Sequence, residues 1–540
     1  MQRRDLISFG FVWFWIALAT LAGMFLDIQE IDATQYACMA REMLDSGSFF
    51  QLFDGTKPYL DKPPLTFWCT AFSYFLFGVS NFAFRLPSVL FGLWAIYSTY
   101  RLARLLHGSL IAHLSAVVLA SCQALFLMNN DVKTDMYLLG PLMFAVWKIV
   151  EWARGGSWRE IALAAGGVGL AMLAKGPIAL VIPSAVLMAD LVWRKNLRRL
   201  VDPTWLLGVP VLVLVLLPFC WGQYHQYGAE GVRFFLWTQS FGRITGESEW
   251  TNDASAFFFV HTFAWAFLPW TPVFIWALFN KVRGFWRAPR EGNEITPLFG
   301  FVFVFAALSL SRFKLPHYIF IVAPFAAILV SEMIVISIPR TLLRVHQTFL
   351  VLMSILAVSL TLGTFPDAPI AWKLLGVTAL LASAWVGMRE SKSAHSLVLS
   401  GAAIMASINL MLNLVFYPGL LSYQSTAQAG KYLAEKAVPA SQIYAYRVSG
   451  RAYNFYSGFV ANPIPAPEKA PDIVKKSNVW VYTDMEGVED LASNRELSIL
   501  DMKSFPHFRV NRITLPFLNP SLRPGVTSTR YLLHLAATKL

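Results

Sequence analysis

Residues 28–84 read IQEIDATQYACMAREMLDSGSFFQLFDGTKPYLDKPPLTFWCTAFSYFLFGVSNFAF and lie between two strongly apolar segments. The stretch carries many more acidic and polar groups than its flanks. Apolar residues within Ile31–Ser46 recur at helical spacing and Gly47 follows them, which predicts a surface helix. Leu65–Val79 is apolar and aromatic, but it is shorter than the roughly 20 residues that cross a bilayer. This pattern predicts a polar cap over a membrane bundle.

The composition places the whole chain in a membrane. Of its 540 residues, 56% are hydrophobic and 14% are charged, whereas soluble proteins carry about 25% charged residues. The net charge of +12 flanks apolar segments, which fits basic cytoplasmic loops and not a nucleic-acid surface. The four cysteines form no CxxC pair and indicate neither a disulfide framework nor a zinc site.

The apolar segments predict a polytopic α-helical protein with about thirteen membrane spans. They are Leu6–Leu26, Leu86–Leu106, Ser109–Met128, Met136–Trp152, Glu160–Ala174, Gly176–Trp193, Trp205–Trp221, Ala256–Phe279, Thr296–Leu310, Pro316–Ile336, Thr348–Phe365, Ile370–Met388 and Ser396–Phe416. If Leu65–Val79 lies along the membrane as a juxtamembrane helix, the Arg/Lys clusters fall on one side, which the positive-inside rule makes cytoplasmic. The amino terminus is then cytoplasmic, and the first outer loop, residues 27–85, is periplasmic or extracellular. Leu6–Leu26 is too long for a cleaved signal peptide, so we expect it to be retained as the first span.

The composition changes near Tyr417, where charged and polar residues return. This predicts a transmembrane domain over residues 1–417 and a small α/β domain over residues 418–540, on the same side as the first outer loop. In the second domain we expect helices at Ser425–Ala437 and Val488–Ser493, and strands at Gln442–Val448, Asn478–Thr483, Ser504–Thr514 and Arg530–Ala536.

Two residues of the first outer loop are candidates for chemistry. Asp32 is the first acid of the predicted surface helix; it is either an N-cap with Gln35 in a capping box, or a base that takes a proton at the membrane face. Lys62 is either a solvated turn lysine or an ammonium that the two following prolines aim at a phosphate oxygen.

Later loops add acids and a loop arginine. In MNNDVKTDMYLLG, Asp131 and Asp135 lie at the outer mouth of the third and fourth spans; they serve solvation and a helix start, or they orient an acceptor. Arg243, in QSFGRITGESEW, is either solvated or a bidentate phosphate ligand. The string GGVGLAMLAKGP lacks the ending of a P-loop, and its glycines predict close helix packing.

The segment SRFKLPHYIF brings Arg312, Lys314, His317 and Tyr318 together at the outer start of the tenth span. The alternatives are a functional cluster, or snorkelling cations beside an aromatic-belt tyrosine.

These motifs together resemble the membrane-embedded C-type (GT-C) glycosyltransferases. DATQYACMAREML, YLDKPPLTFW, FGVSNFAFRLPSVLFG and KLPHY, with the aspartate-bearing second loop and a later LPW, are similar to the dolichyl-phosphate-mannose protein mannosyltransferase group, which includes the bacterial lipid A aminoarabinose transferases. The similarity runs from about Leu6 to Phe325. It implies a polyprenyl-phosphate-linked sugar donor, and inverting transfer to a lipid, protein or glycan acceptor at the periplasmic face of a bacterial inner membrane.

The resemblance also implies residue roles. Asp32 matches the catalytic base. Lys62, Arg243 and Tyr318 match the residues that hold the lipid phosphate, with Lys314 as a neighbouring cation. Asp135 matches the second-loop acid, and Asp131 lies beside it.

This chain departs from the family pattern at two places. Relatives often carry Asp-Glu-x-Arg-Tyr where this chain has Asp32-Ala33-Thr34-Gln35-Tyr36, and Asp61 replaces the commoner Glu before KPP. In some relatives the latter acid helps to bind a metal ion, so a divalent metal at Asp61 stays open and no other cofactor is expected. Two rival functions also stay open: a lipid or solute transporter, and a non-catalytic component of envelope glycan assembly.

Overall fold

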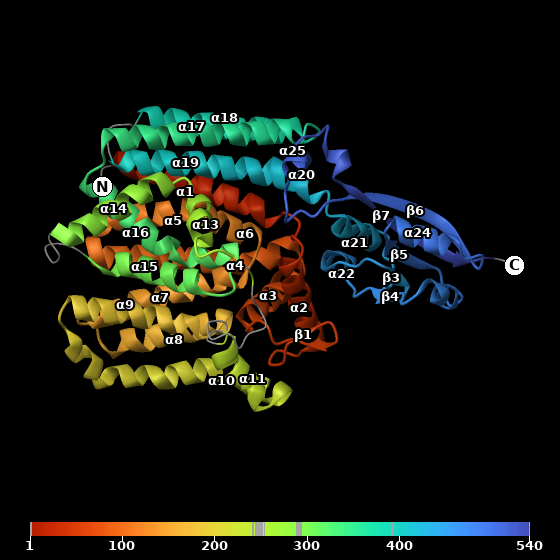
Figure 1. Cartoon of the computed structure of the whole chain (residues 1–540), viewed down its shortest axis with the longest axis horizontal. Coiled ribbons are helices and arrows are strands. Elements are labelled where there is room, and N and C mark those ends of the chain that lie inside the picture. Colours follow the sequence, from red (N-terminus) through yellow and green to blue (C-terminus); the bar gives the residue numbers. More distant parts are fainter. Residues whose placement is uncertain are drawn as a thin grey trace.

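The computed structural model describes residues 3–239, 242, 252, 254–287, 294–389 and 394–538. Most of the helices lie side by side in an elongated bundle, and the C-terminal sheet projects beyond one end of it (Figure 1). The helices of the bundle are α1 (Arg3–Met24), α4 (Asn81–His107), α5 (Ser109–Ser121), α6 (Gln123–Asn130), α7 (Thr134–Ala153), α8 (Trp158–Lys175), α9 (Ile178–Trp193), α10 (Gly208–Tyr227), α11 (Ala229–Arg233), α13 (Phe258–Ala266), α14 (Thr271–Arg287), α15 (Thr296–Leu310), α16 (Ala323–Ile336), α17 (Arg340–Gly363), α18 (Ile370–Arg389) and α19 (Ala394–Met411).

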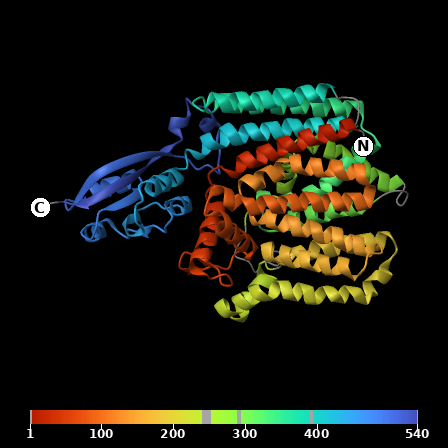
Figure 2. The same cartoon turned by 180° about the vertical axis from the view of Figure 1, so that it is seen from behind.

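Several of these helices have the length and apolar character of membrane spans. Among the described residues five helices meet this test, and the number is seven if two bent helix pairs each count as one span. Helices shorter than 18 residues, such as α9 and α15, are also apolar. The described part of the chain is therefore a mostly helical membrane protein. Helices α1 and α19, from opposite ends of the bundle sequence, pack side by side (Figure 2).

Two predicted spans are not continuous helices. Ala256–Phe279 was predicted as one span, but the structure has α13 and α14 there, with a bend of 119° between them. Pro269 lies at this break, where a proline removes a backbone donor and stops helix propagation. Ser109–Met128 is likewise divided into α5 and α6, which are bent by 49°. The hydrophobicity of a segment does not distinguish a bent pair of helices from one continuous span.

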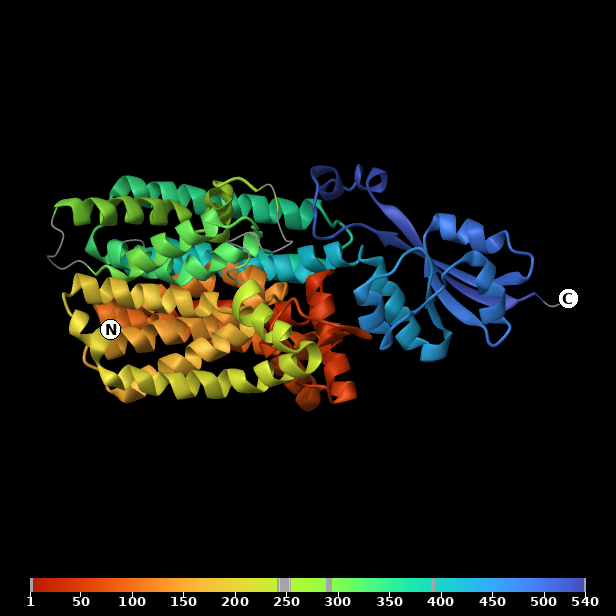
Figure 3. The same ribbon diagram turned by 60° about the horizontal axis from the view of Figure 1, so that its bottom comes forward.

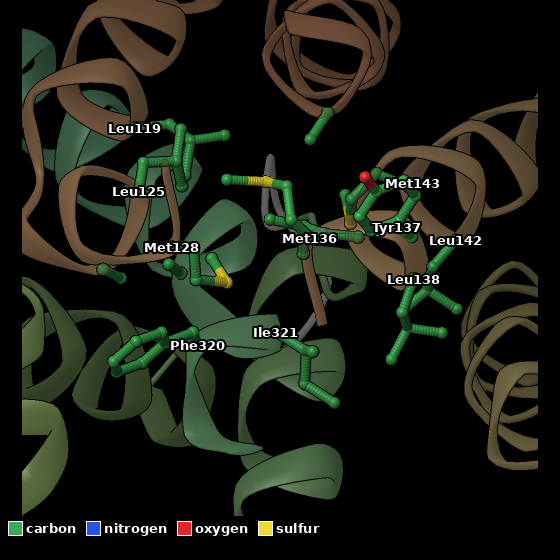
Figure 4. Close-up of a cluster of buried hydrophobic side chains, with 14 of the residues drawn as sticks. Leu119, Leu125, Met128, Met136, Tyr137, Leu138, Leu142, Met143, Phe320 and Ile321 are labelled. Carbon is green, nitrogen blue, oxygen red and sulfur yellow. The ribbon is translucent and has the colours of Figure 1, made fainter. Parts of the chain in front are cut away.

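The centre of the bundle is a close-packed apolar core. Figure 4 shows part of it, where side chains of α5, α6 and α7 meet Phe320 and Ile321 of the segment η4 (Pro316–Val322). A Cβ added to Gly167 of α8 would lie 2.9 Å from the carbonyl oxygen of Pro141 in α7. The prediction that these glycines allow close helix packing is therefore confirmed.

The first outer loop folds against one end of the bundle. It contains α2 (Asp32–Ser46), the two-residue strands β1 (Phe53–Asp54) and β2 (Lys57–Pro58), and α3 (Leu65–Phe77). Helix α2 ends at Gly47, whose φ of 70° is the left-handed conformation that glycine adopts readily. Both helices predicted in this loop are confirmed, with ends within two residues of the prediction.

The C-terminal part of the chain carries a five-stranded sheet with the order β4-β3-β5-β7-β6. Strands β4, β3 and β5 are parallel, and β7 is antiparallel to both β5 and β6. The elements are α21 (Ser425–Glu435), β3 (Ile443–Ala445), α22 (Arg451–Ser457), β4 (Asn462–Pro463), α23 (Ala470–Val474), β5 (Val479–Thr483), α24 (Met485–Ala492), β6 (Leu497–His507) and β7 (Ser528–Ala537). The strand expected at Ser504–Thr514 is corrected to β6, because ten residues from Leu497 onward pair with β7.

The C-terminal part adjoins the first outer loop (Figure 3), and polar contacts join the two. The Lys431 ammonium of α21 lies 2.5 Å from an Asp27 carboxylate oxygen. Arg41 of α2 donates to the carbonyl oxygen of Phe455 in α22 at 3.1 Å. The loop that carries Asp32 is thus held on one side by the bundle and on the other by the sheet domain.

Candidate active site

Asp32 opens helix α2 without capping it. The N-cap is Ile31, and no side chain forms a capping bond there. The alternative in which Asp32 caps the helix with Gln35 in a capping box is therefore wrong. Because its carboxylate is not tied to the helix backbone, it reaches Lys133, in the loop before α7, with a distance of 3.0 Å from Oδ2 to Nζ.

Lys133 links two acids. Its ammonium also lies 3.3 Å from an Asp131 carboxylate oxygen. Partial burial alone would raise the pKa of Asp32, but the charge and hydrogen bond of Lys133 outweigh it and hold that pKa below its usual range. The two carboxylates together raise the pKa of Lys133 against the effect of its burial. Asp32 is therefore ionised at neutral pH, although 47% of its side chain is exposed.

Asp135 lies in the first turn of α7 and is 1% exposed. It forms an ion pair with Lys175, the last residue of α8, and its Oδ2 lies 3.6 Å from Nε2 of His317. The Lys175 ammonium lies 3.9 Å from the centroid of the Tyr318 ring, a cation–π contact. This cluster joins three segments that are distant in sequence.

Lys62 lies at the entrance to α3. Its Nζ is 2.8 Å from a carboxylate oxygen of Asp61. Gln239 donates its side-chain N–H to the backbone carbonyl of Asp61 at 2.6 Å, which ties this turn to the loop after α11. The two prolines that follow Lys62 lead directly into the helix.

A cavity of about 650 Å³ brings these groups together. Its polar lining includes six of the candidates named from sequence, namely Asp32, Asp61, Lys62, Asp135, His317 and Tyr318, together with Gln35, Lys133, Lys175 and Gln239. Its apolar lining comes mainly from α9 and α15, including Ile178, Val181, Ile182, Phe303, Val304, Ala307 and Leu308. The cavity is therefore amphiphilic, with a charged end and a wall of membrane helices.

The remaining candidates lie elsewhere. Asp131 reaches the cavity only through Lys133. Lys314 is not among the lining residues; it is buried, and its Nζ donates to the backbone carbonyl of Ala254 at 3.1 Å. Arg243 lies outside the described residues.

The fold has a close counterpart among solved structures. ArnT from Cupriavidus metallidurans, in the structure bound to undecaprenyl phosphate, aligns with a TM-score of 0.74, and 97% of each chain is covered at 20% identity. The apo form of the same protein aligns with a TM-score of 0.71, covering 91% of this chain and 95% of that one, also at 20% identity. This likeness shows the fold.

Sequence comparisons point the same way. The family model described as dolichyl-phosphate-mannose-protein mannosyltransferase matches residues 61–221. The chain is therefore similar to this mannosyltransferase family over part of its length. An undecaprenyl phosphate-alpha-4-amino-4-deoxy-L-arabinose arabinosyl transferase of Pseudomonas aeruginosa PAO1 is 27% identical over 59% of this chain and 58% of its own length. A protein of that name from Pseudomonas fluorescens Pf0-1 is 27% identical over 57% of this chain and 54% of its own length. The chain thus spans a little over half the length of the curated relatives it matches.

Sequence reasoning missed two lysines of this cavity. Lys133 stands between two acids in NNDVKTD, a local signal that was available. Lys175 ends an apolar helix just before Gly-Pro, and nothing nearby in sequence marks its partner Asp135, 40 positions away. Its position at the end of an apolar span is the feature that could have marked Lys175 as a candidate, because a charged residue within a membrane segment is costly.

The donor set around Asp61 does not fit a metal ion. The Lys62 ammonium already forms an ion pair with the Asp61 carboxylate. Within the described part of the chain, no group of three His, Cys, Asp or Glu side chains is placed to share an ion. The mechanism proposed below for these residues therefore includes no metal ion.

Proposed function

We propose that this protein is an inverting glycosyltransferase that moves a sugar from a polyprenyl-phosphate donor to an acceptor hydroxyl or phosphate. The observation that carries the proposal is the amphiphilic cavity, where Asp32, Lys62 and Tyr318 share one polar end. A polyprenyl-phosphate sugar has matching chemistry, with an anionic head and an apolar tail. The lipid-dependent transferases named among its relatives support the same reading.

The apolar lining suits the tail of such a donor. Side chains of α9 and α15 form this part of the cavity, and both helices are apolar. An isoprenoid chain leaves the bilayer at little cost when it enters a groove with an apolar wall, because its surface stays out of water. The head group would then lie at the polar end.

The cations at that end suit the leaving phosphate. Lys62 offers a compact ammonium on a turn fixed by prolines, and Tyr318 offers a phenol beneath the Lys175 ammonium. Fixed positive groups stabilise the charge that grows on the phosphate as its bond to the sugar breaks. We assign Lys62 and Tyr318 to this role, with Arg243 from the outer loop as the third group.

Asp32 is the proposed base. The acceptor oxygen attacks the anomeric carbon from the face opposite the phosphate and forms the new glycosidic bond. The bond from that carbon to the phosphate oxygen breaks, and its electron pair leaves with the lipid phosphate. When the acceptor is a hydroxyl or a monoprotonated phosphate, its proton passes to the ionised Asp32 carboxylate, whose low pKa favours transfer late in the reaction, when that proton is most acidic. Asp135 is proposed to orient the acceptor side of the cavity, with Asp131 acting on it through Lys133.

We further propose the arrangement of the chain in a bacterial inner membrane. Residues 1–417 form the membrane domain with about thirteen spans, and residues 418–540 form the periplasmic α/β domain. The amino terminus is cytoplasmic. The contacts between the first outer loop and α21 and α22 support placing both on one side.

Reconstitution tests the proposed function directly. The purified protein is placed in lipid nanodiscs with undecaprenyl-phosphate-linked 4-amino-4-deoxy-L-arabinose and lipid A, and products are identified by mass spectrometry. We expect a glycosylated acceptor with the wild type and none with Asp32→Asn. In liposomes, movement of the donor across the bilayer without transfer would instead support a transporter. Neither transfer nor movement, with this donor and with a mannose donor, would support a non-catalytic component.

A further inference from the structure

A continuous line of polar contacts runs from the C-terminal sheet domain to the cavity. Arg451, the first residue of α22, forms a two-pronged ion pair with Asp54 in β1, in which Nη2 lies 2.5 Å from Oδ2 and Nη1 contacts Oδ1. Oδ2 of Asp54 also accepts a hydrogen bond of 2.9 Å from Nε2 of Gln35. Gln35 lines the cavity, one helical turn after Asp32. Arg451 and Asp54 are 397 positions apart along the chain, so only the fold brings them together.

The surroundings hold this line in place. Glu42, on the same helix as Gln35, accepts a 2.7 Å hydrogen bond from the backbone N–H of Gly55, next to Asp54. On the other side, the carboxylate of Glu30 accepts a 2.9 Å bond from the backbone N–H of Ala452 in α22. The turn next to Asp54 is thus fixed to α2, and the segment before α2 is fixed to α22. A bidentate arginine–carboxylate pair adds a defined orientation to this anchoring.

The anchoring decides what Gln35 can offer a ligand. A carboxylate only accepts hydrogen bonds, so the group that faces Asp54 is the amide nitrogen. The amide oxygen of Gln35 then points away from Asp54. It accepts no hydrogen bond from the described residues. A carboxamide oxygen is uncharged and accepts from O–H or N–H groups. It therefore suits a hydroxyl or ammonium group of a sugar and not a phosphate.

We propose that Gln35 is a specificity-determining residue that accepts a hydrogen bond from a hydroxyl or ammonium group of the transferred sugar, and that Arg451 is a positioning residue that acts on it through Asp54. This inference rests on the proposed function and deepens it. The C-terminal domain thereby contributes to sugar selection without touching the substrate. Loss of Arg451 frees the Asp54 carboxylate, and the amide loses its fixed orientation.

A double-mutant cycle tests the link. Gln35→Ala, Arg451→Ala and the double variant are compared in nanodiscs for kcat/KM with undecaprenyl-phosphate-linked 4-amino-4-deoxy-L-arabinose and with analogues in which one hydroxyl or the amine is replaced by fluorine. We expect each single variant to lose about tenfold with the parent donor, the loss typical of one hydrogen bond to a neutral group. The double variant should lose no more than either single variant, because both remove the same interaction. One fluorinated analogue should lose about tenfold with the wild type and nothing further with Gln35→Ala.

Lys431→Ala is the matched control. It also removes an ion pair between the sheet domain and the first outer loop, with Asp27, but it leads to no residue of the cavity. We expect it to stay within about twofold of the wild type, whereas Arg451→Lys should recover part of the lost activity because it restores a single-pronged pair. Thermal unfolding of each variant checks that the fold is retained.

Two results would overturn the inference. If the losses of Gln35→Ala and Arg451→Ala multiply in the double variant, the residues act independently. If Lys431→Ala loses as much as Arg451→Ala, the effect belongs to domain docking in general. A wild type that transfers none of these sugars would overturn the proposed function itself, which is a distinct outcome.

Discussion

Replacing Lys133 should change the pH at which the enzyme loses activity. Lys133→Met keeps the apolar stem but removes the ammonium, which lies 3.0 Å from the Asp32 carboxylate. Lys133 holds the pKa of Asp32 below its usual range, and the active form in the proposed mechanism is the ionised one. Without the ammonium this pKa rises, so the ionised form is lost at a higher pH as the solution is acidified. The acidic limb of the profile therefore moves to higher pH.

The size of the effect follows from distance and exposure. Two unit charges 3.0 Å apart interact by about 1.4 kcal/mol in bulk water, and more strongly at lower dielectric. Because 47% of the Asp32 side chain is exposed, solvent screening keeps the contribution near the lower limit, about 1–2 kcal/mol. That is about tenfold in an equilibrium constant. On the acidic limb, kcat/KM of the variant should thus fall about tenfold further than it does on the alkaline plateau.

The assay is kcat/KM against pH, since this ratio reports the ionisation of the free enzyme. Asp131→Asn is the control, because it removes the second partner of Lys133 and leaves the ammonium to Asp32 alone. Its acidic limb should stay in place or move to lower pH. If Lys133→Met keeps the acidic limb of the wild type, then Lys133 does not set the charge state of the base, and the assignment of Asp32 loses its electrostatic support.

Three further outcomes are expected. Asp32→Asn should abolish transfer while expression and thermal stability stay near those of the wild type, because the shape survives and the proton acceptor does not; residual transfer above about one per cent would remove Asp32 from the mechanism. Lys62→Ala should raise the donor KM about tenfold with little change in the acceptor KM. Lys314→Ala should leave the donor KM within about twofold of the wild-type value. Steady-state kinetics with each substrate varied in turn measure these constants. Gly222→Ala should lower stability by about 1–3 kcal/mol in thermal unfolding, because the new Cβ would clash with the backbone carbonyl oxygen of Phe50 in the first outer loop. Gly10→Ala, with nothing within 4 Å of the new Cβ, should leave stability unchanged.

The fold was predictable where a local pattern carries it. The helix at the start of the first outer loop combines helical periodicity with a terminal glycine, and the structure has it at Asp32–Ser46. Strand β5 is buried along its whole length, which gave a clear apolar run. Strand β6 is mostly exposed and lies at the sheet edge, so it lacks the alternation that marks a half-buried strand. Its position was therefore misjudged by several residues.

The site was predictable as single residues but not as pairs. Asp32, Lys62 and Tyr318 stand in recognisable motifs, and all three line one cavity. Lys62 pairs with its neighbour Asp61, but the partners of Asp32 and Tyr318 come from other segments, so sequence spacing does not reveal them. Lys175 reaches Asp135 across 40 positions, and Arg451 reaches Asp54 across 397. A local sequence pattern predicts candidate residues within one helix or loop. The contacts between these residues depend on how the helices pack.

These pairs also determine what the cavity can bind. The described residues that line it include three acids, Asp32, Asp61 and Asp135, and each has a lysine partner that lines it too. The fully ionised lining is therefore close to neutral before a donor enters, apart from His317. In the proposed mechanism a lipid phosphate adds negative charge beside Lys62, so it would share that ammonium with Asp61. A shared lysine stabilises its carboxylate less, and a less stabilised carboxylate is a stronger base. Donor binding at Lys62 would thus raise the basicity of Asp61, whereas the proposed base Asp32 keeps its own partner, Lys133.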